Sequence, residues 1–365
     1  MPRVPLNDLS RISADTAANI LRSVADVIER GAFLKGPFTA ELERRLSGRL
    51  SGRPVLGVAN GTDALYLALR AIGLSPGHKV ATVSNAGGYT SGVALNIGAT
   101  PVFVDVDPRT GQMSSTALAE VLSAQPGVSA VVLTHLYGLV GDVREIAALC
   151  SSHGVPLVED CAQSMGAQVG GQPAGTFGQI ATTSFYPTKN LGAYGDGGAV
   201  ISSTPALHEL VARIAQYGWG SRYEVAVPGG INSRIDEMQA AVLLETELAL
   251  DAHNERRRTI VARYAAAASG SRYMIGEHSE RFVGHLAVMV TDDRSGDASR
   301  LDAAGVGTGV HYPILDHRQP GWAGLVPDSP LPATEWLVDR ILTVPCFPTM
   351  TDDEVDQVAS AIALL

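Results

Sequence analysis

Long hydrophobic runs, cysteine and excess positive charge are all scarce in this sequence of 365 residues. No stretch reaches the run of about 18 apolar residues that a membrane-spanning helix needs, so we expect no membrane association. The N-terminal sequence MPRVPLNDLSR lacks the apolar centre of a signal peptide. Lys and Arg number 27 against 37 Asp and Glu, which gives a net charge of −10 with no basic stripe. Phosphate binding needs clustered positive charge, so we expect no nucleic acid partner.

The three cysteines, Cys150, Cys161 and Cys346, are odd in number and show no CxxC spacing. Such a set predicts neither a disulfide framework nor a zinc site. We therefore expect no metal and a reducing, cytoplasmic location for a soluble protein.

The remaining composition is that of a globular protein. Hydrophobic residues make up 45% and charged residues 18%, which excludes a disordered chain and a coiled coil. The 39 glycines fall in short turns, as in a fold with many strand-to-helix corners. The length exceeds what one hydrophobic core usually serves, so the chain should form two domains or one large domain with a smaller satellite.

Short β-branched runs alternate with helical patterns in the middle of the chain. Strands that alternate with helices favour a mostly parallel α/β sheet, because each crossover must cover a sheet face. Near-continuous apolarity within the runs indicates that both faces of the sheet are buried. The expected strands are residues 102–106 (VFVDV), 130–133 (AVVL), 156–159 (PLVE), 182–185 (TTSF) and 198–201 (GAVI).

Three parts of the chain differ in pattern, and they predict the domain organisation. Residues 1–35 look like an N-terminal arm, with a helical stretch packed on the outside. Residues 36–250 should form the large domain, and the long helical pattern of residues 236–266 leads out of it. Residues 251–365 should form a small α+β domain that ends in a helix over residues 352–364.

The segment Asn60-Gly61-Thr62-Asp63 directly precedes an amphipathic helical stretch, ALYLALRAIG. Gly61 permits a tight turn, and Thr62 or Asp63 can cap the helix. Free N–H groups and the positive end of the helix dipole form an anion site. Taken alone, the tetrapeptide can equally be an ordinary helix cap.

An acidic pair, Glu159-Asp160, ends the apolar run PLVED. An acid at the carboxyl end of a buried parallel strand points into the crevice where α/β folds bind ligands. Gln163 follows about one helical turn later and can face the same crevice. A turn residue that caps the next helix is the alternative reading.

A single lysine, Lys189, lies between the apolar run TTSFYPT and the glycine-rich turn GAYGDGG. A lysine in such surroundings can be desolvated, which lowers the pKa of its amine and makes it nucleophilic. In isolation a solvated loop lysine is an equally valid reading.

An anion-binding helix start, an acid at a strand end and one lysine follow one another in chain order. Pyridoxal phosphate requires this set: a lysine for its aldehyde, a carboxylate for its ring nitrogen and backbone donors for its phosphate. The combination therefore predicts this cofactor with far more specificity than any one of the three features.

Many longer segments carry a family resemblance over nearly the whole chain: GPFTAELERRL, ANGTDALYLALRAIG, GATPVFVDVDPRTG, HLYGLVGDV, VEDCAQSMGA, TTSFYPTKNLGAYGDGGAV, GINSRIDEMQAAVL, GVHYPI and VPCFPTMTDDEV. On these motifs the sequence resembles the DegT/DnrJ/EryC1/StrS family of pyridoxal-phosphate aminotransferases, which act on nucleotide-linked keto sugars. The resemblance implies the aspartate aminotransferase-like fold (fold type I), with a large, mostly parallel-sheet domain that binds the cofactor and a small α+β C-terminal domain.

The resemblance also implies roles for individual residues. Lys189 matches the lysine that forms the Schiff base with the cofactor and moves the substrate proton. Asp160 matches the partner of the ring nitrogen, and Gln163 matches the residue beside the cofactor hydroxyl. The phosphate cup corresponds to Gly61, Thr62 and Ser184.

Four further residues match other parts of the family pattern. Asn232 matches the residue that a neighbouring subunit supplies to the phosphate, which implies a homodimer with shared active sites. His311 and Tyr312 match a loop near the sugar nucleotide, or pack within the small domain. Tyr89 matches the aromatic residue over the cofactor ring, but it comes a residue or two late, after the loop at residues 84–88. Either this loop is rebuilt so that Tyr89 still stacks on the ring, or another group covers the ring.

The implied activity is ping-pong transamination, from glutamate to the keto group of a nucleotide-diphospho-6-deoxy sugar. By family habit the nucleotide is thymidine diphosphate, and the product serves deoxysugar biosynthesis for an antibiotic or a surface glycan. The 3- and 4-positions of the sugar both stay open. A sugar dehydratase of the same family has His in place of the lysine, which Lys189 opposes. A non-catalytic regulator with a retained cofactor site is the alternative from another class, and a plain phosphate-binding protein leaves Asp160 and Lys189 without a role.

Overall fold

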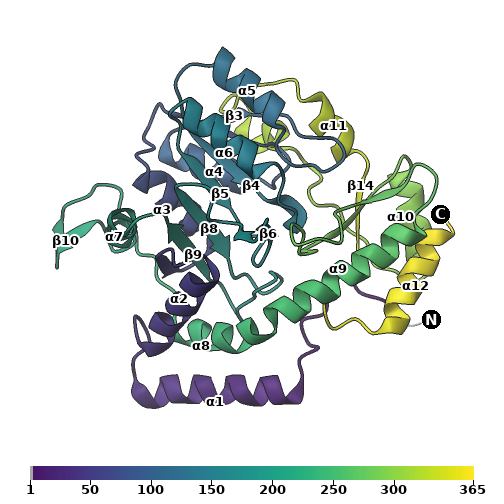
Figure 1. The fold of residues 1–365 in the computed structure, drawn as a ribbon, viewed down its shortest axis with the longest axis horizontal. Helices are drawn as coiled ribbons and strands as arrows, with labels where there is room; N and C mark the ends of the chain where they lie inside the picture. Colours follow the sequence, from purple (N-terminus) through teal and green to yellow (C-terminus); the bar gives the residue numbers. More distant parts are fainter. Residues whose placement is uncertain (1–2) are drawn as a thin grey trace.

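The computed structural model describes residues 3–365, and a seven-stranded sheet forms its centre (Figure 1). The strand order is β1-β9-β8-β5-β4-β2-β3. The five strands from β3 to β8 in this order are parallel, and β9 runs antiparallel to both β8 and β1. The strands are β1 (Val55–Val58), β2 (Lys79–Thr82), β3 (Thr100–Phe103), β4 (Val128–Thr134), β5 (Leu157–Asp160), β8 (Ile180–Ser184) and β9 (Gly198–Ser202).

Helices cover both faces of this sheet, which explains the continuous apolarity of its strands. Within β4, Ala130 and Val132 join one buried cluster while Val131 and Leu133 join the other, because successive side chains of a strand point to opposite faces. The first cluster includes α3 (Gly61–Ala71), α4 (Tyr89–Ile97) and α7 (Pro205–Ile214). The second includes α2 (Pro37–Arg49), α5 (Ser115–Ala124) and α6 (Val143–Ser152). The predicted α/β fold class is confirmed.

The strand expected at residues 102–106 is wrong at its carboxyl end, since β3 stops at Phe103. The Asp105 carboxylate instead accepts hydrogen bonds from the N–H groups of Ala333 and Thr334, at 3.0 and 2.8 Å. These residues begin α11 (Pro332–Val338), so the apolar run ends in a contact with a distant helix.

The long helical segment is interrupted. It consists of α8 (Glu237–Thr246), a short 3₁₀ turn η2 (Glu247–Ala249) and α9 (Leu250–Ala267). The helix α1 (Ala14–Arg30) packs along α8, and α9 runs from there to the second sheet (Figure 1).

The second sheet is small and antiparallel, in the order β12 (Tyr273–Ile275), β13 (Ala287–Val290) and β14 (Ile341–Val344). The helices α9, α10 (Arg294–Ala303) and α12 (Asp352–Ala363) pack around it. Shorter elements are η1 (Leu136–Gly138), η3 (Asp316–Arg318), η4 (Pro320–Trp322) and two small hairpins, β6 (Gln168–Val169) with β7 (Gln172–Pro173) and β10 (Trp219–Ser221) with β11 (Glu224–Val225).

The start of the described chain is attached to this second sheet's side of the molecule. Val4 forms a parallel bridge with Val306. The Arg11 guanidinium donates two hydrogen bonds to the Glu354 carboxylate, at 2.6 and 2.7 Å, and lies over the Phe347 ring. Within residues 3–365, no helix has both the length and the apolar character needed to span a membrane.

Candidate active site

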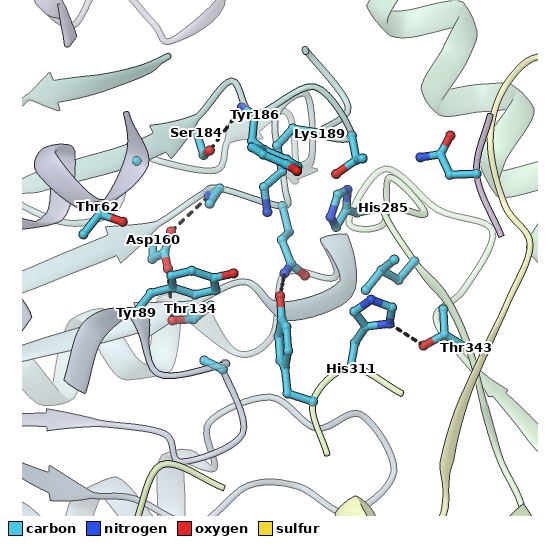
Figure 2. Close-up of a pocket in the computed structure, with 18 of the residues that line it drawn as sticks. Thr62, Tyr89, Thr134, Asp160, Ser184, Tyr186, Lys189, His285, His311 and Thr343 are labelled. Carbon is cyan, nitrogen blue, oxygen red and sulfur yellow. Dashed lines mark hydrogen bonds between the residues drawn. The ribbon is translucent and has the colours of Figure 1, made fainter. Parts of the chain in front are cut away.

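A cavity of about 520 Å³ lies at the carboxyl ends of β4, β5 and β8, where the large sheet faces the small one. Parallel strands of an α/β sheet direct the residues that follow them to this edge, which is where such folds bind ligands. Nine of the ten residues expected in the site line the cavity: Gly61, Thr62, Tyr89, Asp160, Gln163, Ser184, Lys189, His311 and Tyr312. Figure 2 shows that Lys189, Asp160 and Tyr89 face the same space.

Asp160 is the last residue of β5 and its carboxyl group is buried. Oδ1 accepts a hydrogen bond from the Ala162 N–H at 3.1 Å, and Oδ2 accepts a long one from the Thr134 hydroxyl at 3.4 Å. Burial raises the pKa of this carboxyl, opposed by the Ala162 N–H and the positive charge of Lys189. A cation that reached Asp160 would remove this penalty, because opposite charge favours the ionised form.

Glu159, the preceding residue, points to the other face of the sheet and is fully buried. Its carboxylate accepts hydrogen bonds from the N–H groups of Gly175, Phe177 and Gly178, at 2.8, 2.7 and 2.7 Å. His135 Nε2 lies 3.0 Å from the same carboxylate. Glu159 thus ties the turn before β8 to the end of β5, and Asp160 alone of the acidic pair enters the cavity.

Lys189 follows β8 and reaches the cavity from the opposite side to Tyr89 (Figure 2). Burial lowers the pKa of its amine, and the Asp160 carboxylate opposes this shift. His285 lies beside Lys189, and its Nδ1 is 2.9 Å from Asn190 Oδ1. Burial lowers the pKa of the His285 imidazole, and the positive charge of Lys189 lowers it further. Both shifts favour the uncharged forms of the Lys189 amine and the His285 imidazole, which are the forms that can accept a proton.

The N-terminus of α3 forms one end of the cavity. The helix cap is Asn60, whose side-chain oxygen accepts the Asp63 N–H at 2.7 Å, so the expected cap at Thr62 or Asp63 is wrong. The first N–H groups of a helix have no partner within it, so those of Gly61 and Thr62 are available to a ligand. A Cβ on Gly61 would lie 2.7 Å from Ser184 Cβ, so only glycine allows this helix end to approach β8 so closely.

Gln163 joins two segments at the cavity wall. Its side-chain oxygen accepts the Tyr137 N–H at 2.6 Å, and its amide nitrogen donates to the Tyr312 hydroxyl at 3.3 Å. The Tyr137 hydroxyl in turn donates to the His311 carbonyl at 2.8 Å. These bonds hold the 311–312 segment against the large sheet.

Tyr89 begins α4, is 49% exposed and projects into the cavity opening. Its ring meets that of Tyr312 edge to face, with centroids 6.2 Å apart. The loop at residues 84–88 therefore places Tyr89 at the cavity. His311 Nδ1 lies 2.9 Å from the Thr343 hydroxyl on β14, so this histidine both packs on the small sheet and lines the cavity.

Asn232 is the tenth expected residue, and it does not line the cavity that the described residues form. It is exposed, pairs with Gln216 through a backbone bridge and accepts a hydrogen bond from the Arg234 guanidinium. Its expected role toward a second subunit stays a prediction.

Sequence reasoning missed several residues of the cavity wall. Leu6 and Asn7 come from the N-terminal arm, and Thr343 and His285 come from the small sheet's side. Packing between distant segments brings them there, and no local pattern marks them. Tyr186 and Thr188 also line the cavity and could have been found, because they flank Lys189 in the quoted motif.

Comparisons with known proteins agree with this geometry. The chain is 35% identical over 361 residues to the UDP-N-acetyl-3-dehydro-alpha-D-glucosamine 3-aminotransferase of Acidithiobacillus ferrooxidans, covering 98% of this chain and 97% of the relative. It is 34% identical to the dTDP-3-amino-3,4,6-trideoxy-alpha-D-glucose transaminase of Streptomyces venezuelae, covering 99% and 96%. The crystal structure of S. venezuelae DesV in complex with a ketimine intermediate superposes with a TM-score of 0.94, at 33% identity, over 100% of this chain and 98% of that one. The model of the DegT/DnrJ/EryC1/StrS aminotransferase family matches residues 14–363. With both sequence and fold matched along nearly its whole length, the chain belongs to this family of sugar aminotransferases.

Proposed function

We propose that the protein is a pyridoxal-phosphate-dependent aminotransferase that places an amino group on the keto group of a nucleotide-diphospho sugar. The observation that carries the proposal is the convergence of Lys189 and Asp160 in one cavity beside the free N-terminus of α3. The family of the chain supports the same reaction class.

The residues present fit pyridoxal phosphate at three points. The Asp160 carboxyl is buried with two hydrogen bonds and a raised pKa, so a protonated ring nitrogen would satisfy it. The close approach of Gly61 to Ser184 leaves backbone N–H groups and one hydroxyl for a phosphate. Lys189 supplies an amine within the same cavity.

When bound, pyridoxal phosphate supplies an aldehyde for the amino group and a ring that withdraws electrons from the reacting carbon. Asp160 would hold the protonated ring nitrogen, which would strengthen this withdrawal. Burial lowers the pKa of the Lys189 amine, which favours the unprotonated form that can take and return the substrate proton. Tyr89 would cover the ring from the cavity opening, and Gln163 would be the residue beside the ring hydroxyl.

The proposed acceptor is a keto sugar linked to thymidine or uridine diphosphate, with glutamate as the amino donor. The two named relatives act on sugars of these two kinds, and both names carry a 3-amino designation. This supports amination at position 3.

A second copy of the chain would complete the site. Among the described residues, Lys189 is the only Lys or Arg in the cavity lining, whereas a nucleotide diphosphate and a cofactor phosphate bring several negative charges. Asn232 and Arg234 are available outside the cavity to serve a neighbouring copy. We therefore infer a homodimer with shared active sites.

The test is turnover of 3-keto and 4-keto sugar nucleotides with glutamate, followed by mass spectrometry of the product. The wild-type protein should form the amino sugar, and Lys189→Ala should form none. Lys79→Ala is the matched control, because this lysine is the first residue of β2, and the cavity lies at the carboxyl ends of the parallel strands. A dehydrated product would establish the dehydratase instead. A protein that binds pyridoxal phosphate but turns over no sugar would favour the regulator, and one that binds no cofactor would refute the proposal.

A further inference from the structure

The loop before Tyr89 packs closely against two aromatic rings, those of Tyr312 and Trp322. Gly87 and Gly88 both have positive φ, +81° and +83°, a conformation that favours glycine. A Cβ on Gly87 would lie 3.0 Å from the Tyr312 ring, and one on Gly88 would lie 2.9 Å from the Trp322 ring. The loop and residues 311–322 are therefore fitted to one another.

Buried hydrogen bonds join these two segments. The Asp316 N–H donates to the Ser84 carbonyl at 2.8 Å, and the His317 N–H donates to the Ser84 hydroxyl at 3.2 Å. The same hydroxyl lies 2.7 Å from His317 Nδ1. The Ser91 hydroxyl, in the first turn of α4, donates to Asp316 Oδ2 at 2.5 Å. Ser84 and Ser91 are fully buried and Asp316 is 1% exposed.

The Asp316 carboxyl accepts the Ser91 hydroxyl at the N-terminus of α4, where no side chain caps the N–H groups of the first turn. Residue Gly88 stands at the N-cap of α4 and has no side chain to accept a first-turn donor. Asp316 supplies an acceptor from a segment more than 200 residues away, at the end of the helix where negative charge is favoured. Burial raises the pKa of this carboxyl to about 7, although the Ser91 hydroxyl and the Gly88 N–H oppose the shift. Its Oδ1 has no hydrogen-bond partner among residues 3–365, so the protein keeps a costly buried group here.

We propose that Asp316 is a positioning residue that fixes Tyr89 and Tyr312 over the cofactor-binding side of the cavity. Tyr89 begins the helix whose first turn Asp316 contacts through Ser91, and Tyr312 lies four residues before Asp316. Tyr312 contacts Tyr89 edge to face and accepts the hydrogen bond from Gln163. The hydrogen bonds between the two segments therefore affect the position of both rings. The identity of the cofactor rests on the proposed function, whereas the link between the two segments rests on their hydrogen bonds alone.

The test compares Asp316→Ala, Asp316→Asn and Ser91→Ala with the control Asp328→Ala. Asp328 lies six residues beyond the 311–322 segment, is exposed and pairs only with Arg318 among the described residues. The first readout is the dissociation constant for pyridoxal phosphate, measured by absorbance. The second is hydrogen exchange of residues 89–97 in the cofactor-free protein. The third is whether kcat or KM for the sugar nucleotide changes.

We expect Asp316→Ala to bind pyridoxal phosphate at least about fivefold more weakly and to exchange faster over residues 89–97, because the buried hydrogen bond that joins α4 to the 311–322 segment is lost. Asp316→Asn should recover most of both, since its amide oxygen can still accept the Ser91 hydroxyl. Ser91→Ala should show the same two changes more weakly, and it serves if Asp316→Ala does not fold. Affinity and exchange equal to those of Asp328→Ala would overturn the proposal. Failure of the wild-type protein to bind pyridoxal phosphate would instead refute the proposed function. The exchange data would still show whether Asp316 holds residues 89–97 in place.

Discussion

Replacement of Glu159 by Gln removes one buried negative charge while the shape of the side chain is kept. Both carboxylate oxygens are engaged in the wild-type protein. Oε1 accepts the N–H groups of Phe177 and Gly178, and Oε2 accepts the Gly175 N–H and lies against His135. The amide of Gln has one oxygen and one NH₂ group, so one side of this arrangement must meet a donor instead of an acceptor.

The less costly orientation keeps the amide oxygen toward Phe177 and Gly178. This orientation leaves the Gly175 N–H buried without an acceptor, which costs about 1–3 kcal/mol. The bonds from the Phe177 and Gly178 N–H groups remain but lose their charged acceptor, which costs about 1 kcal/mol for each bond. We therefore expect Glu159→Gln to lower the free energy of unfolding by about 3–5 kcal/mol.

The effect should also depend on pH. Burial alone would raise the pKa of Glu159, but hydrogen bonds from His135 and from the Gly178 and Gly175 N–H groups lower it below the ordinary 4.5. A carboxyl with a depressed folded-state pKa stabilises the protein above its unfolded pKa, and this contribution disappears as the pH falls through the folded value. The difference between wild type and Glu159→Gln should thus be full at neutral pH and shrink below about pH 4.

Urea unfolding of the cofactor-free protein measures this difference directly, with Glu209→Gln as the matched control. Glu209 is exposed and pairs only with Arg213 among residues 3–365, so its variant should unfold like the wild type. A loss below about 1 kcal/mol for Glu159→Gln at neutral pH would refute the reasoning, because such a value is ordinary for any substitution.

Three further predictions concern other parts of the site. Arg11→Ala breaks the double hydrogen bond to Glu354, so the melting temperature should fall and a protease should cut the N-terminal arm faster; unchanged digestion would contradict this. Gly87→Ala places a Cβ at φ +81° and 3.0 Å from the Tyr312 ring, so urea unfolding should show a loss of about 1–2 kcal/mol, and no loss would contradict the geometry. Because Asp316 has its pKa raised from 3.8 to about 7, the folded state holds a proton that the unfolded chain releases, and stability falls as the pH rises through this window. Asp316→Asn should lack this fall when melting temperatures are compared across the window, and an identical pH profile would contradict the assignment.

Local patterns in the sequence predict most of the large sheet. The run PLVE predicts β5, and GAVI predicts β9 to within one residue, because strands buried on both faces are apolar throughout. The antiparallel direction of β9 has no such signature, since a buried run reads the same both ways. The early end of β3 depends on the contact of Asp105 with α11, which no local pattern contains.

The same distinction holds for the candidate site. Asp160 and Lys189 can be predicted because each ends an apolar run at the edge of the sheet where ligands bind. Asn7 and Thr343 reach the cavity only through packing between segments that are distant in sequence. The contact of Asp316 with the first turn of α4 is equally hidden, since that helix begins at Tyr89, more than 200 residues earlier.

The covalent anchor of the cofactor is the central claim, and its most direct test is the visible absorption spectrum of the purified protein with pyridoxal phosphate, before and after borohydride, followed by peptide mapping. The account predicts a yellow protein that bleaches on reduction and retains a pyridoxyl group on Lys189. A protein that stays colourless with added pyridoxal phosphate, or a label on another lysine such as Lys79, would contradict it.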